Sequence, residues 1–215
     1  MLGIRRSGLT RFYLVRHGQT EWNRIERFRG RVDIPLNATG VAQAQAAAES
    51  LVGKGISAIF SSPLGRALKT AEIIGARLGL PVEKLDGLVD MDYGEWQGLT
   101  PDEVAQEYSS PLDLWLKHPE QARIPSGESL DDVGNRVLAA VYDLASRHPE
   151  RTLLLSSHKV VCKVLLCAVL GLDNSHFWQI EQDNTAISVF DYNPKMGFSV
   201  SLVNDTCHLR SLPSA

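Results

Sequence analysis

The chain has 215 residues and a mass of 23.7 kDa, which suits one domain or one domain with a sizeable insertion. Hydrophobic residues make up 44% of it and charged residues 22%, an ordinary balance for a globular protein with a core of normal size. The formal net charge is -3, so neither nucleic acid nor an acidic membrane surface is an expected partner. An anionic ligand would need a local cluster of positive groups.

The cysteines and the apolar segments indicate the cellular compartment to expect. The three cysteines fit neither a disulfide framework nor a zinc motif, so a reducing, cytoplasmic location is expected. Residues 1–10 carry arginines but no long apolar stretch, which predicts a flexible N-terminal extension and not a signal peptide. The most apolar segment, residues 160–172, is interrupted by Lys163 and is too short to span a bilayer.

The first predicted element is a buried strand, residues 12–15, which ends in Arg16-His17-Gly18. An open α/β sheet presents its ligand groups at the ends of its strands. Arginine binds phosphate oxygens in a planar fork, and an imidazole nitrogen can attack phosphorus and carry the phosphoryl group. A turn histidine beside a surface arginine is the commoner interpretation of an isolated pair. The arginine-rich segment 24–31 that follows is interpreted mostly as a solvated loop.

Two helices and a short strand are predicted next. Thr39 is expected to cap the first helix, and residues 56–61 predict the strand. Ser62 and Pro63 then predict the start of a second helix. Arg66 falls in the first turn of that helix, where backbone amides and the helix dipole favour an anion, although a solvated helix arginine is the simpler alternative.

An acidic segment precedes a predicted insertion. Asp90, Asp92 and Glu95 alternate with apolar and aromatic residues in a segment that ends in glycines. Such a segment can supply a general acid, and an acidic surface loop is an equal alternative. Residues 99–129 contain a capping box and short helical turns, and we expect this insertion to roof a site.

A second histidine repeats the position of the first. Residues 152–157 predict a buried strand that ends in His158, and a helix of residues 159–171 follows at once. A satisfied core histidine is the commoner role for one histidine alone. Its place at a strand end, like that of His17, favours a shared site.

The order of the elements predicts the fold class. Strands alternate with helices for most of the chain, and residues 185–191 and 199–204 predict a final pair of antiparallel strands. This order predicts an α/β fold: a three-layer α/β/α sandwich with a mostly parallel central sheet and an antiparallel edge.

Four motifs resemble those of the histidine phosphatase superfamily, the phosphoglycerate mutase-like proteins. They are Leu14-Val15-Arg16-His17-Gly18-Gln19-Thr20, Ser61-Ser62-Pro63-Leu64-Gly65-Arg66-Ala67, Tyr93-Gly94-Glu95-Trp96-Gln97-Gly98 and Ser157-His158. Their order and spacing agree with the family over residues 11–208. The resemblance implies a phosphoglycerate mutase-like fold in a single domain of residues 11–215.

The resemblance also implies roles for individual residues. His17 would be the nucleophile that becomes phosphohistidine. The phosphoryl oxygens would be held by Arg16, Arg66 and His158. The phosphate pocket would be supported by Thr20 and Asn23. No metal or other cofactor is implied, because a positive pocket does the electrostatic work of a metal.

Two positions depart from the pattern of the family. The acid is usually a glutamate, and Asp90 stands at that position here, with Asp92 and Glu95 as the other candidates. Lys159 follows His158 where glycine is frequent, and its side chain would add positive charge for substrate binding.

The resemblance implies a phosphomonoester hydrolase whose partner is a small phosphorylated metabolite. The main alternative is a phosphoglycerate mutase that depends on 2,3-bisphosphoglycerate. Lesser alternatives are a catalytically inactive phosphate-binding homologue and a zinc hydrolase that uses His17, His158 and Asp90. The segment 170–178, the pair Asp183-Asn184 and the segment 206–209 are similar to the tail of metal-independent phosphoserine phosphatases. A homodimer is one expectation, because dimers occur among similar proteins.

Overall fold

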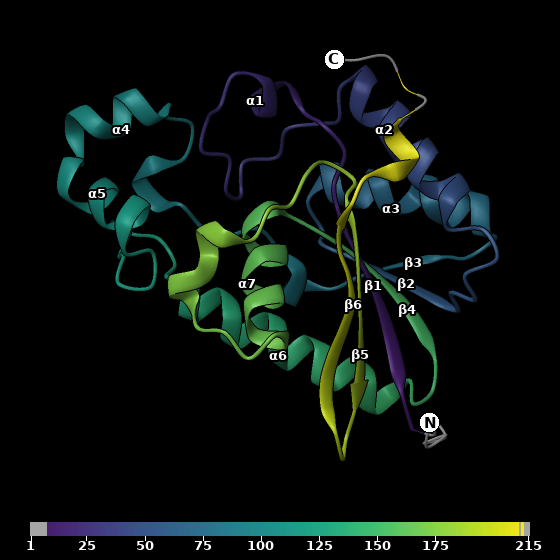
Figure 1. The fold of residues 1–215 in the computed structure, drawn as a ribbon. Coiled ribbons are helices and arrows are strands. Elements are labelled where there is room, and N and C mark those ends of the chain that lie inside the picture. Colours follow the sequence, from purple (N-terminus) through teal and green to yellow (C-terminus); the bar gives the residue numbers. More distant parts are fainter. Residues whose placement is uncertain (1–7, 211, 213–215) are drawn as a thin grey trace.

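The centre of the molecule is a six-stranded sheet with the strand order β3-β2-β4-β1-β5-β6 (Figure 1). The computed structural model describes residues 8–210 and residue 212. The strands are β1 (Thr10–Arg16), β2 (Ala58–Ser61), β3 (Val82–Lys84), β4 (Thr152–Ser157), β5 (Ile187–Asn193) and β6 (Gly197–Asp205). The strands β1 to β4 pair in parallel, whereas β5 pairs antiparallel with β1 and β6. The predicted sheet, mostly parallel with an antiparallel edge, is confirmed.

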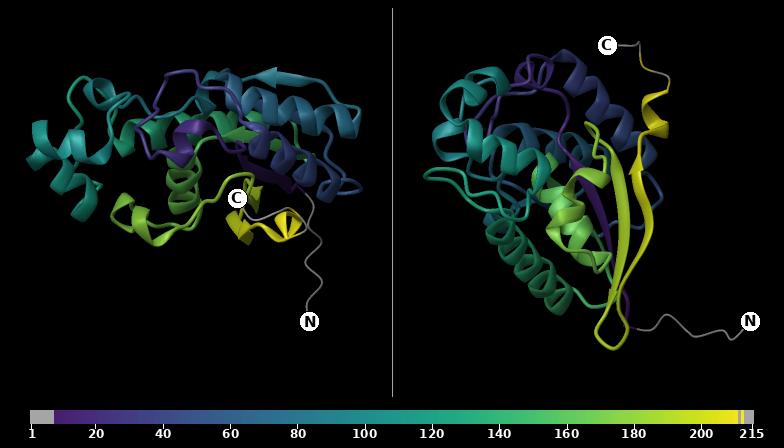
Figure 2. Two further views of the ribbon diagram at one scale, coloured as in Figure 1. Left: turned by 90° about the horizontal axis from the view of Figure 1, so that it is seen from above. Right: turned by 60° about the vertical axis from the view of Figure 1, so that its left-hand side comes forward.

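Helices cover both faces of this sheet (Figures 1 and 2). The covering helices are α2 (Ala38–Ser50), α3 (Gly65–Leu78), α6 (Leu130–Arg147) and α7 (Lys159–Val169). Because side chains alternate along a strand, neighbouring strand residues enter different cores. Val15 and Leu154 pack with α2 and α3, whereas Leu14 and Leu155 pack with α6 and α7. The predicted three-layer sandwich is therefore confirmed.

The remaining elements are short. They are α1 (Glu21–Arg24), α4 (Pro101–Glu107), α5 (Ser109–Lys117), and the 3-10 helices η1 (Asp86–Leu88), η2 (Gly94–Trp96), η3 (Asn174–Gln179) and η4 (Cys207–Leu209). Helices α4 and α5 lie at one end of the molecule, far from α2 and α3 (Figure 1). They come from the predicted insertion.

The carboxyl ends of three neighbouring strands meet at one level of the sheet. Arg16 pairs with Ser157 across β1 and β4, and Ser61 pairs with Ser156 across β2 and β4. His17, His158 and Ser62 each follow the last residue of one of these strands. The pairing register therefore brings together three residues that are far apart in the sequence.

Two predicted helix starts are wrong by a few residues. Asn37, and not Thr39, caps α2, because its side chain accepts a hydrogen bond of 2.8 Å from the backbone N–H of Gly40. Helix α3 begins at Gly65, so Ser62 does not cap it. The Ser62 hydroxyl has another partner, which is described with the site below.

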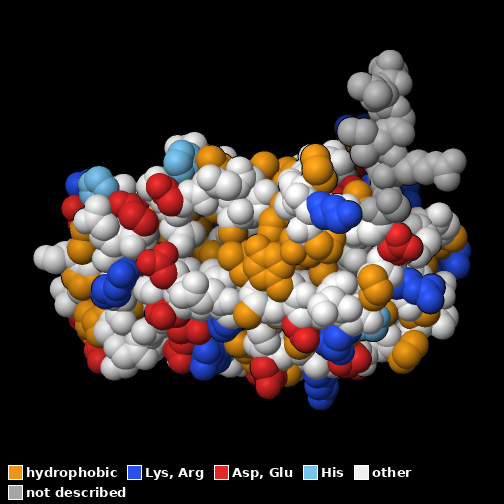
Figure 3. Space-filling model, turned by 90° about the horizontal axis from the view of Figure 1, so that it is seen from below, with side chains coloured by type: hydrophobic (Ala, Val, Ile, Leu, Met, Phe, Trp, Pro, Cys, Tyr) orange, Lys and Arg blue, Asp and Glu red, His pale blue; other side chains and the backbone are white. Residues whose placement is uncertain are grey.

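Packing at the surface joins α6 to the final hairpin. Tyr142 of α6 is exposed, and its ring contacts Tyr192 of β5 and Phe198 of β6. Figure 3 shows the molecule from below, where hydrophobic side chains gather in the middle of a face that otherwise carries charges of both signs. Single aromatic side chains at a surface are normal in globular proteins.

Part of the predicted N-terminal extension can be compared with the structure. Residues 1–7 lie outside the described residues, whereas Thr10 already belongs to β1 and is buried. Along the described part of the chain, no helix is both long and apolar enough to cross a membrane.

Candidate active site

The two histidines predicted at strand ends lie side by side. The ring centroids of His17 and His158 are 5.2 Å apart, and the rings are inclined by 57°. Both side chains are buried, with 1% and 0% of their surface exposed. The parallel pairing of β1 with β4 produces this proximity, because each histidine follows its strand directly.

A hydrogen bond orients the imidazole ring of His17 through one of its two nitrogens. Its Nδ1 lies 2.7 Å from the carbonyl oxygen of Gly18, which can only accept, so Nδ1 carries the proton. The Nε2 atom has no hydrogen-bond partner among the described residues. Burial, and the positive charge of Arg66 nearby, hold the pKa of His17 well below its usual value. The ring is therefore neutral near pH 7, with the lone pair of Nε2 available.

Two predicted arginines surround this ring and are fixed by backbone carbonyls. Arg66 is fully buried, and its Nη1 and Nη2 donate to the carbonyls of Val32 (2.9 Å) and Gly30 (2.7 Å). Arg16 is buried too, and its Nη1 donates to the carbonyl of Gln182 at 2.7 Å. Neither guanidinium can turn without losing these bonds, so the positive charge has a fixed place.

A third arginine of this cluster was not expected. Arg29 belongs to the segment interpreted mostly as a solvated loop, and for this residue that interpretation does not hold. Its Nη1 donates to the carbonyl oxygen of Trp22 at 3.0 Å, and its side chain lines the cavity described below. Burial, with the charge of Arg29 nearby, lowers the pKa of Arg16 to about 10. No local signal in the sequence separates Arg29 from its exposed neighbours.

Asp90 is the predicted acid that reaches the cluster. Its Oδ2 lies 2.8 Å from Arg66 Nη2 and 3.5 Å from His158 Nδ1. Its Oδ1 accepts a hydrogen bond of 2.9 Å from the backbone N–H of Met91. Arg136 donates to the backbone carbonyl of Asp90, which fixes the chain at this point.

The two other candidate acids lie elsewhere. Asp92 forms an ion pair of 3.5 Å with Arg31, and Glu95 is exposed and accepts a hydrogen bond of 2.9 Å from the hydroxyl of Tyr108. Neither carboxylate lines the cavity. Among the three alternating acids, Asp90 alone contacts the histidine and arginine cluster.

Ser62 is a site residue that the sequence reasoning missed. Its Oγ lies 2.8 Å from His158 Nε2 and accepts a hydrogen bond of 3.3 Å from the backbone N–H of Leu64. Among the described residues, His158 Nε2 is the acceptor within reach of the Ser62 hydroxyl proton. We infer that Ser62 donates to Nε2, so the proton of the neutral ring sits on Nδ1 and faces Asp90. The strand-end position of Ser62, beside that of His158, was the available signal.

Burial also controls the charge of His158. The buried ring lies close to Arg66, and both effects hold the pKa of His158 well below its usual value. A neutral His158 can still donate one hydrogen bond from Nδ1. The residue therefore offers a donor to an anion without adding a further buried charge.

Several buried N–H groups of this cluster lack an acceptor among the described residues. They are Arg16 Nε, Arg29 Nε, Arg66 Nε and His158 Nδ1. A buried donor without a partner costs about 1–3 kcal/mol, and more when it is charged. An oxyanion with several acceptor oxygens would satisfy donors of this kind. The site therefore places donors suited to an anion beside a neutral imidazole.

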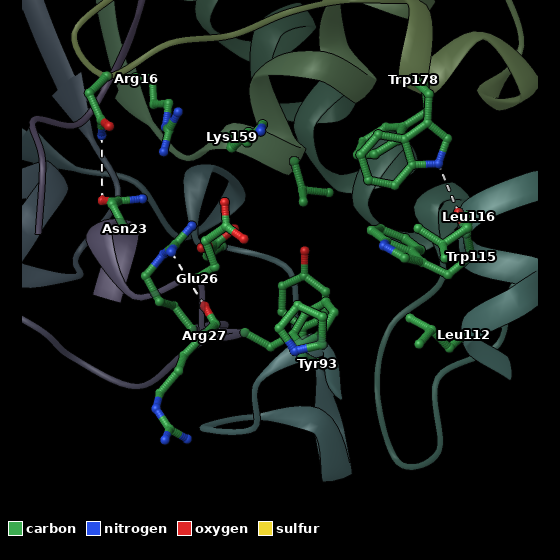
Figure 4. Close-up of a pocket in the computed structure, with 17 residues that line it drawn as sticks. Arg16, Asn23, Glu26, Arg27, Tyr93, Leu112, Trp115, Leu116, Lys159 and Trp178 are labelled. Atoms are coloured by element: carbon green, nitrogen blue, oxygen red, sulfur yellow. Dashed lines mark hydrogen bonds between the residues drawn. The ribbon is translucent and has the colours of Figure 1, made fainter. Parts of the chain in front are cut away.

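A cavity of about 510 Å³ opens onto this cluster (Figure 4). Its polar end is lined by Arg16, Asn23, Glu26, Arg27, Arg29, Asp90, Lys159 and Asn184. Burial, and the charge of Arg16, lower the pKa of Lys159. Asn184, which sequence reasoning did not assign to the site, donates from Nδ2 to the carbonyl oxygen of His17 at 3.0 Å.

Thr20 and Asn23, predicted to support the phosphate pocket, have different places. Asn23 lines the cavity, whereas Thr20 is fully buried and is not part of the lining. The Thr20 hydroxyl donates to Asn23 Oδ1 at 3.0 Å. Thr20 therefore fixes the orientation of Asn23.

Residues of the predicted insertion also reach the cavity. They are Pro101, Leu112, Trp115 and Leu116. A hydrogen bond of 2.8 Å from Trp178 Nε1 to the carbonyl of Trp115 joins α5 to η3 (Figure 4). Within the described residues, no three His, Cys, Asp or Glu side chains are grouped so that they could hold a metal ion.

Comparison with known proteins agrees with this geometry. A family model described as the histidine phosphatase superfamily (branch 1) matches residues 12–206. The chain belongs to the histidine phosphatase superfamily. The resemblance seen in its four motifs is thereby confirmed.

Named members of this superfamily resemble the chain over nearly its whole length. It is 35% identical over 201 residues to phosphoserine phosphatase 1 of Hydrogenobacter thermophilus. This alignment covers 94% of this chain and 95% of the relative. It is 36% identical over 208 residues to a Proteus mirabilis protein named "Probable phosphoglycerate mutase GpmB", over 93% and 95% of the two chains. A solved mycobacterial glucosyl-3-phosphoglycerate phosphatase, in complex with VO3, superposes with a TM-score of 0.84 at 30% identity, over 91% and 99% of the two chains.

The proton position on His158 is directly testable. In ¹⁵N-histidine NMR spectra at pH 7, we expect Nδ1 of His158 to be protonated and Nε2 to be unprotonated. Ser62→Ala should mix the two tautomers and lower kcat/KM for a phosphomonoester roughly fivefold, the effect of one hydrogen bond worth about 1 kcal/mol.

Ser61→Ala is the matched control, because the buried Ser61 hydroxyl donates to the carbonyl of Ser62 and does not contact His158. It should leave the His158 signals unchanged. A protonated Nε2 and an unprotonated Nδ1 in the unsubstituted protein would contradict the assignment.

Proposed function

We propose that this histidine phosphatase hydrolyses a small phosphorylated metabolite through a phosphohistidine formed on His17. The observation that carries the proposal is a neutral imidazole with a free Nε2, buried among arginines whose Nε–H groups have no acceptor among the described residues. Only an unprotonated imidazole nitrogen can attack phosphorus. The surrounding donors match the oxygens on which charge is spread during phosphoryl transfer.

In the first step, His17 Nε2 attacks phosphorus in line and the bond from phosphorus to the leaving oxygen breaks. Asp90 gives its proton to that oxygen. A substrate that arrives as the phosphate monoanion brings this proton, which passes to Asp90. The phosphoryl group would take the place of Asp90 on Arg66 Nη2, so the carboxyl would be released to face the leaving group.

In the second step, water attacks the phosphorus of phosphohistidine and gives a proton to Asp90. The bond between phosphorus and Nε2 breaks, and His17 leaves as the neutral ring. The Gly18 carbonyl keeps the other ring proton on Nδ1 throughout. Asp90 then passes this proton to the departing phosphate, which leaves as the monoanion, so the enzyme returns to its starting protonation state.

Several further residues support the anion in this proposal. Arg16, Arg66 and His158 would contact the phosphoryl oxygens, and Asn23 and Lys159 would line the substrate side of the same pocket. Thr20 would act by positioning Asn23, and Asn184 by positioning the backbone of His17. Lys159 adds a cation beside Arg16, where a compact substrate could place an acidic group.

Phosphoglycerate mutase activity is the second candidate, because a relative carries that name. The same phosphohistidine would then be transferred to a second hydroxyl of the bound sugar acid and not to water. Product analysis separates the two functions. A mutase interconverts phosphoglycerates and needs 2,3-bisphosphoglycerate, whereas a phosphatase releases inorganic phosphate without it.

Labelling that is quenched in alkaline denaturant tests the nucleophile. Incubation with a ³²P-labelled phosphomonoester should give a protein-bound label that is stable in base and lost in acid, because phosphohistidine behaves in this way. His17→Ala should abolish it. His176→Ala is the control, because that side chain lies at the surface beside Asp173. Acid-labile label that persists in His17→Ala would refute the assignment.

Leaving-group dependence tests the acid. Asp90→Asn should lower kcat/KM for alkyl phosphates about 10²- to 10³-fold, because the alkoxide then leaves without a proton. For p-nitrophenyl phosphate, whose leaving group needs little protonation, the loss should be less than about tenfold. Asp92→Asn serves as the control and should change neither value. Equal losses on both substrates would show that Asp90 is not the proton donor.

A further inference from the structure

The cavity has two chemically different ends. The end opposite the arginines, here called the outer half, is lined by Phe28, Tyr93, Leu112, Trp115, Leu116, Val160, Phe177 and Trp178. Figure 4 shows Trp178, Trp115, Leu116, Leu112 and Tyr93 on the side away from Arg16 and Asn23. The whole cavity of about 510 Å³ lies within the range of roughly 300–1,000 Å³ that is typical of sites for drug-sized ligands. A phosphoryl group fills only its polar end.

The side chains of the outer half carry only three polar atoms, the hydroxyl of Tyr93 and the indole N–H groups of Trp115 and Trp178. Trp178 Nε1 donates to the carbonyl of Trp115, whereas Trp115 Nε1 has no hydrogen-bond partner among the described residues. The hydroxyl of Tyr93 has no hydrogen-bond partner among the described residues and points into the cavity (Figure 4). A ligand here meets aromatic and aliphatic side chains, and the unpaired polar groups of this half are one hydroxyl and one indole N–H.

The aromatic side chains of this half are held rigidly. Trp115 packs against Phe177 and Trp178 with ring centroids 5.3 Å and 5.7 Å apart. The ammonium group of the buried Lys163 lies 4.4 Å and 4.6 Å from the centroids of Phe177 and Trp178. A cation over two ring faces fixes their orientation. The rings therefore form a preformed surface.

Apolar side chains remain exposed at the mouth of the cavity. Leu116 is 57% exposed and Trp178 is 39% exposed, although both line the same space as the buried Trp115. An apolar part of a ligand would remove these side chains from water. Because burial of apolar surface is the main source of affinity in such pockets, an apolar ligand is favoured here over a charged one.

We propose that the outer half binds a flat, apolar part of the leaving group. The preferred substrates are then phosphomonoesters of alcohols that carry an aromatic or similar ring. This inference rests on the proposed phosphatase function and names the substrate class of the same site. The competing class is a compact acidic phosphomonoester, such as phosphoserine, whose charged groups would find Lys159 and Arg29 at the polar end and leave the outer half unused.

Three substrates separate these classes. They are 2-phenylethyl phosphate, ethyl phosphate and phosphoserine. The first two have similar alkoxide leaving groups, so a difference between them reports binding of the ring. We expect kcat/KM for 2-phenylethyl phosphate to exceed that for ethyl phosphate roughly 10- to 100-fold, the effect of burying one ring-sized apolar group. It should also exceed the value for phosphoserine.

Substitutions on α5 locate the effect. Leu116→Asp should lower kcat/KM for 2-phenylethyl phosphate at least tenfold and leave that for ethyl phosphate unchanged, and Leu116→Ala should have a smaller effect in the same direction. Leu114→Asp is the control, because Leu114 is on the same helix and 38% exposed but does not line the cavity.

The outcomes distinguish this inference from the proposed function. Hydrolysis of ethyl phosphate at the same rate as 2-phenylethyl phosphate, a clear preference for phosphoserine, or equal losses on both alkyl substrates in Leu116→Asp would overturn the apolar subsite alone. Failure to hydrolyse any alkyl or aryl phosphate, with no phosphohistidine formed, would overturn the phosphatase function as well.

Discussion

The central constraint on this structure is the burial of two positively charged arginines beside the imidazole rings of His17 and His158. Arg16 and Arg66 are almost fully buried, and each is held by backbone carbonyl oxygens, with Asp90 as the carboxylate in contact with Arg66. Burying a charge without a partner is expensive, so these carbonyls stabilise what would otherwise destabilise the fold. Burial first, and then the positive charge of Arg66, hold the pKa values of His17 and His158 well below their usual value, so both rings are neutral. One arrangement thus places buried positive donors beside an imidazole nitrogen that carries no proton.

The sheet explains why this arrangement could be predicted in part. A buried apolar run that ends in a histidine can be recognised in the sequence, and parallel strands place their carboxyl ends together. His17 and His158 were found in this way, and Arg66 from its place in the first turn of the next helix. The motifs of the family added Asp90, and the structure shows that it alone among three alternating acids contacts the cluster.

Other parts of the site could not be predicted because they depend on tertiary neighbours. Ser62 looked like a helix cap, but its hydroxyl lies beside His158 only because β2 and β4 are adjacent. Arg29 looked like a loop residue, and nothing local shows that its loop folds over the sheet end. The apolar outer half combines residues from α5, η3 and the segment around Tyr93, which are far apart in the chain. The predicted start of α2 was wrong because a nearby polar residue, Asn37, makes the capping hydrogen bond that was expected of Thr39.

The geometry of the site shows what the shorter side chain of Asp90 can reach. Asp90 is one methylene shorter than the usual glutamate, and in the structure its carboxylate lies against Arg66 and faces His158 Nδ1. Arg136 donates a hydrogen bond to the backbone carbonyl of Asp90, and the backbone N–H of Met91 donates one to its Oδ1. These two bonds limit how far the Asp90 carboxylate can move. In the proposed mechanism, the leaving oxygen therefore has to come close to the cluster itself. A leaving group that extends into the outer half of the cavity would pass directly beside Asp90, which lines the same space.

A crystal structure with vanadate tests the central claim most directly, because vanadate adopts the geometry of a phosphoryl group in transfer. The account predicts vanadium bonded to Nε2 of His17, with its oxygens within hydrogen-bond distance of Arg16, Arg66 and His158 Nδ1. Vanadate bound through a different side chain, or held away from both histidines, would contradict it.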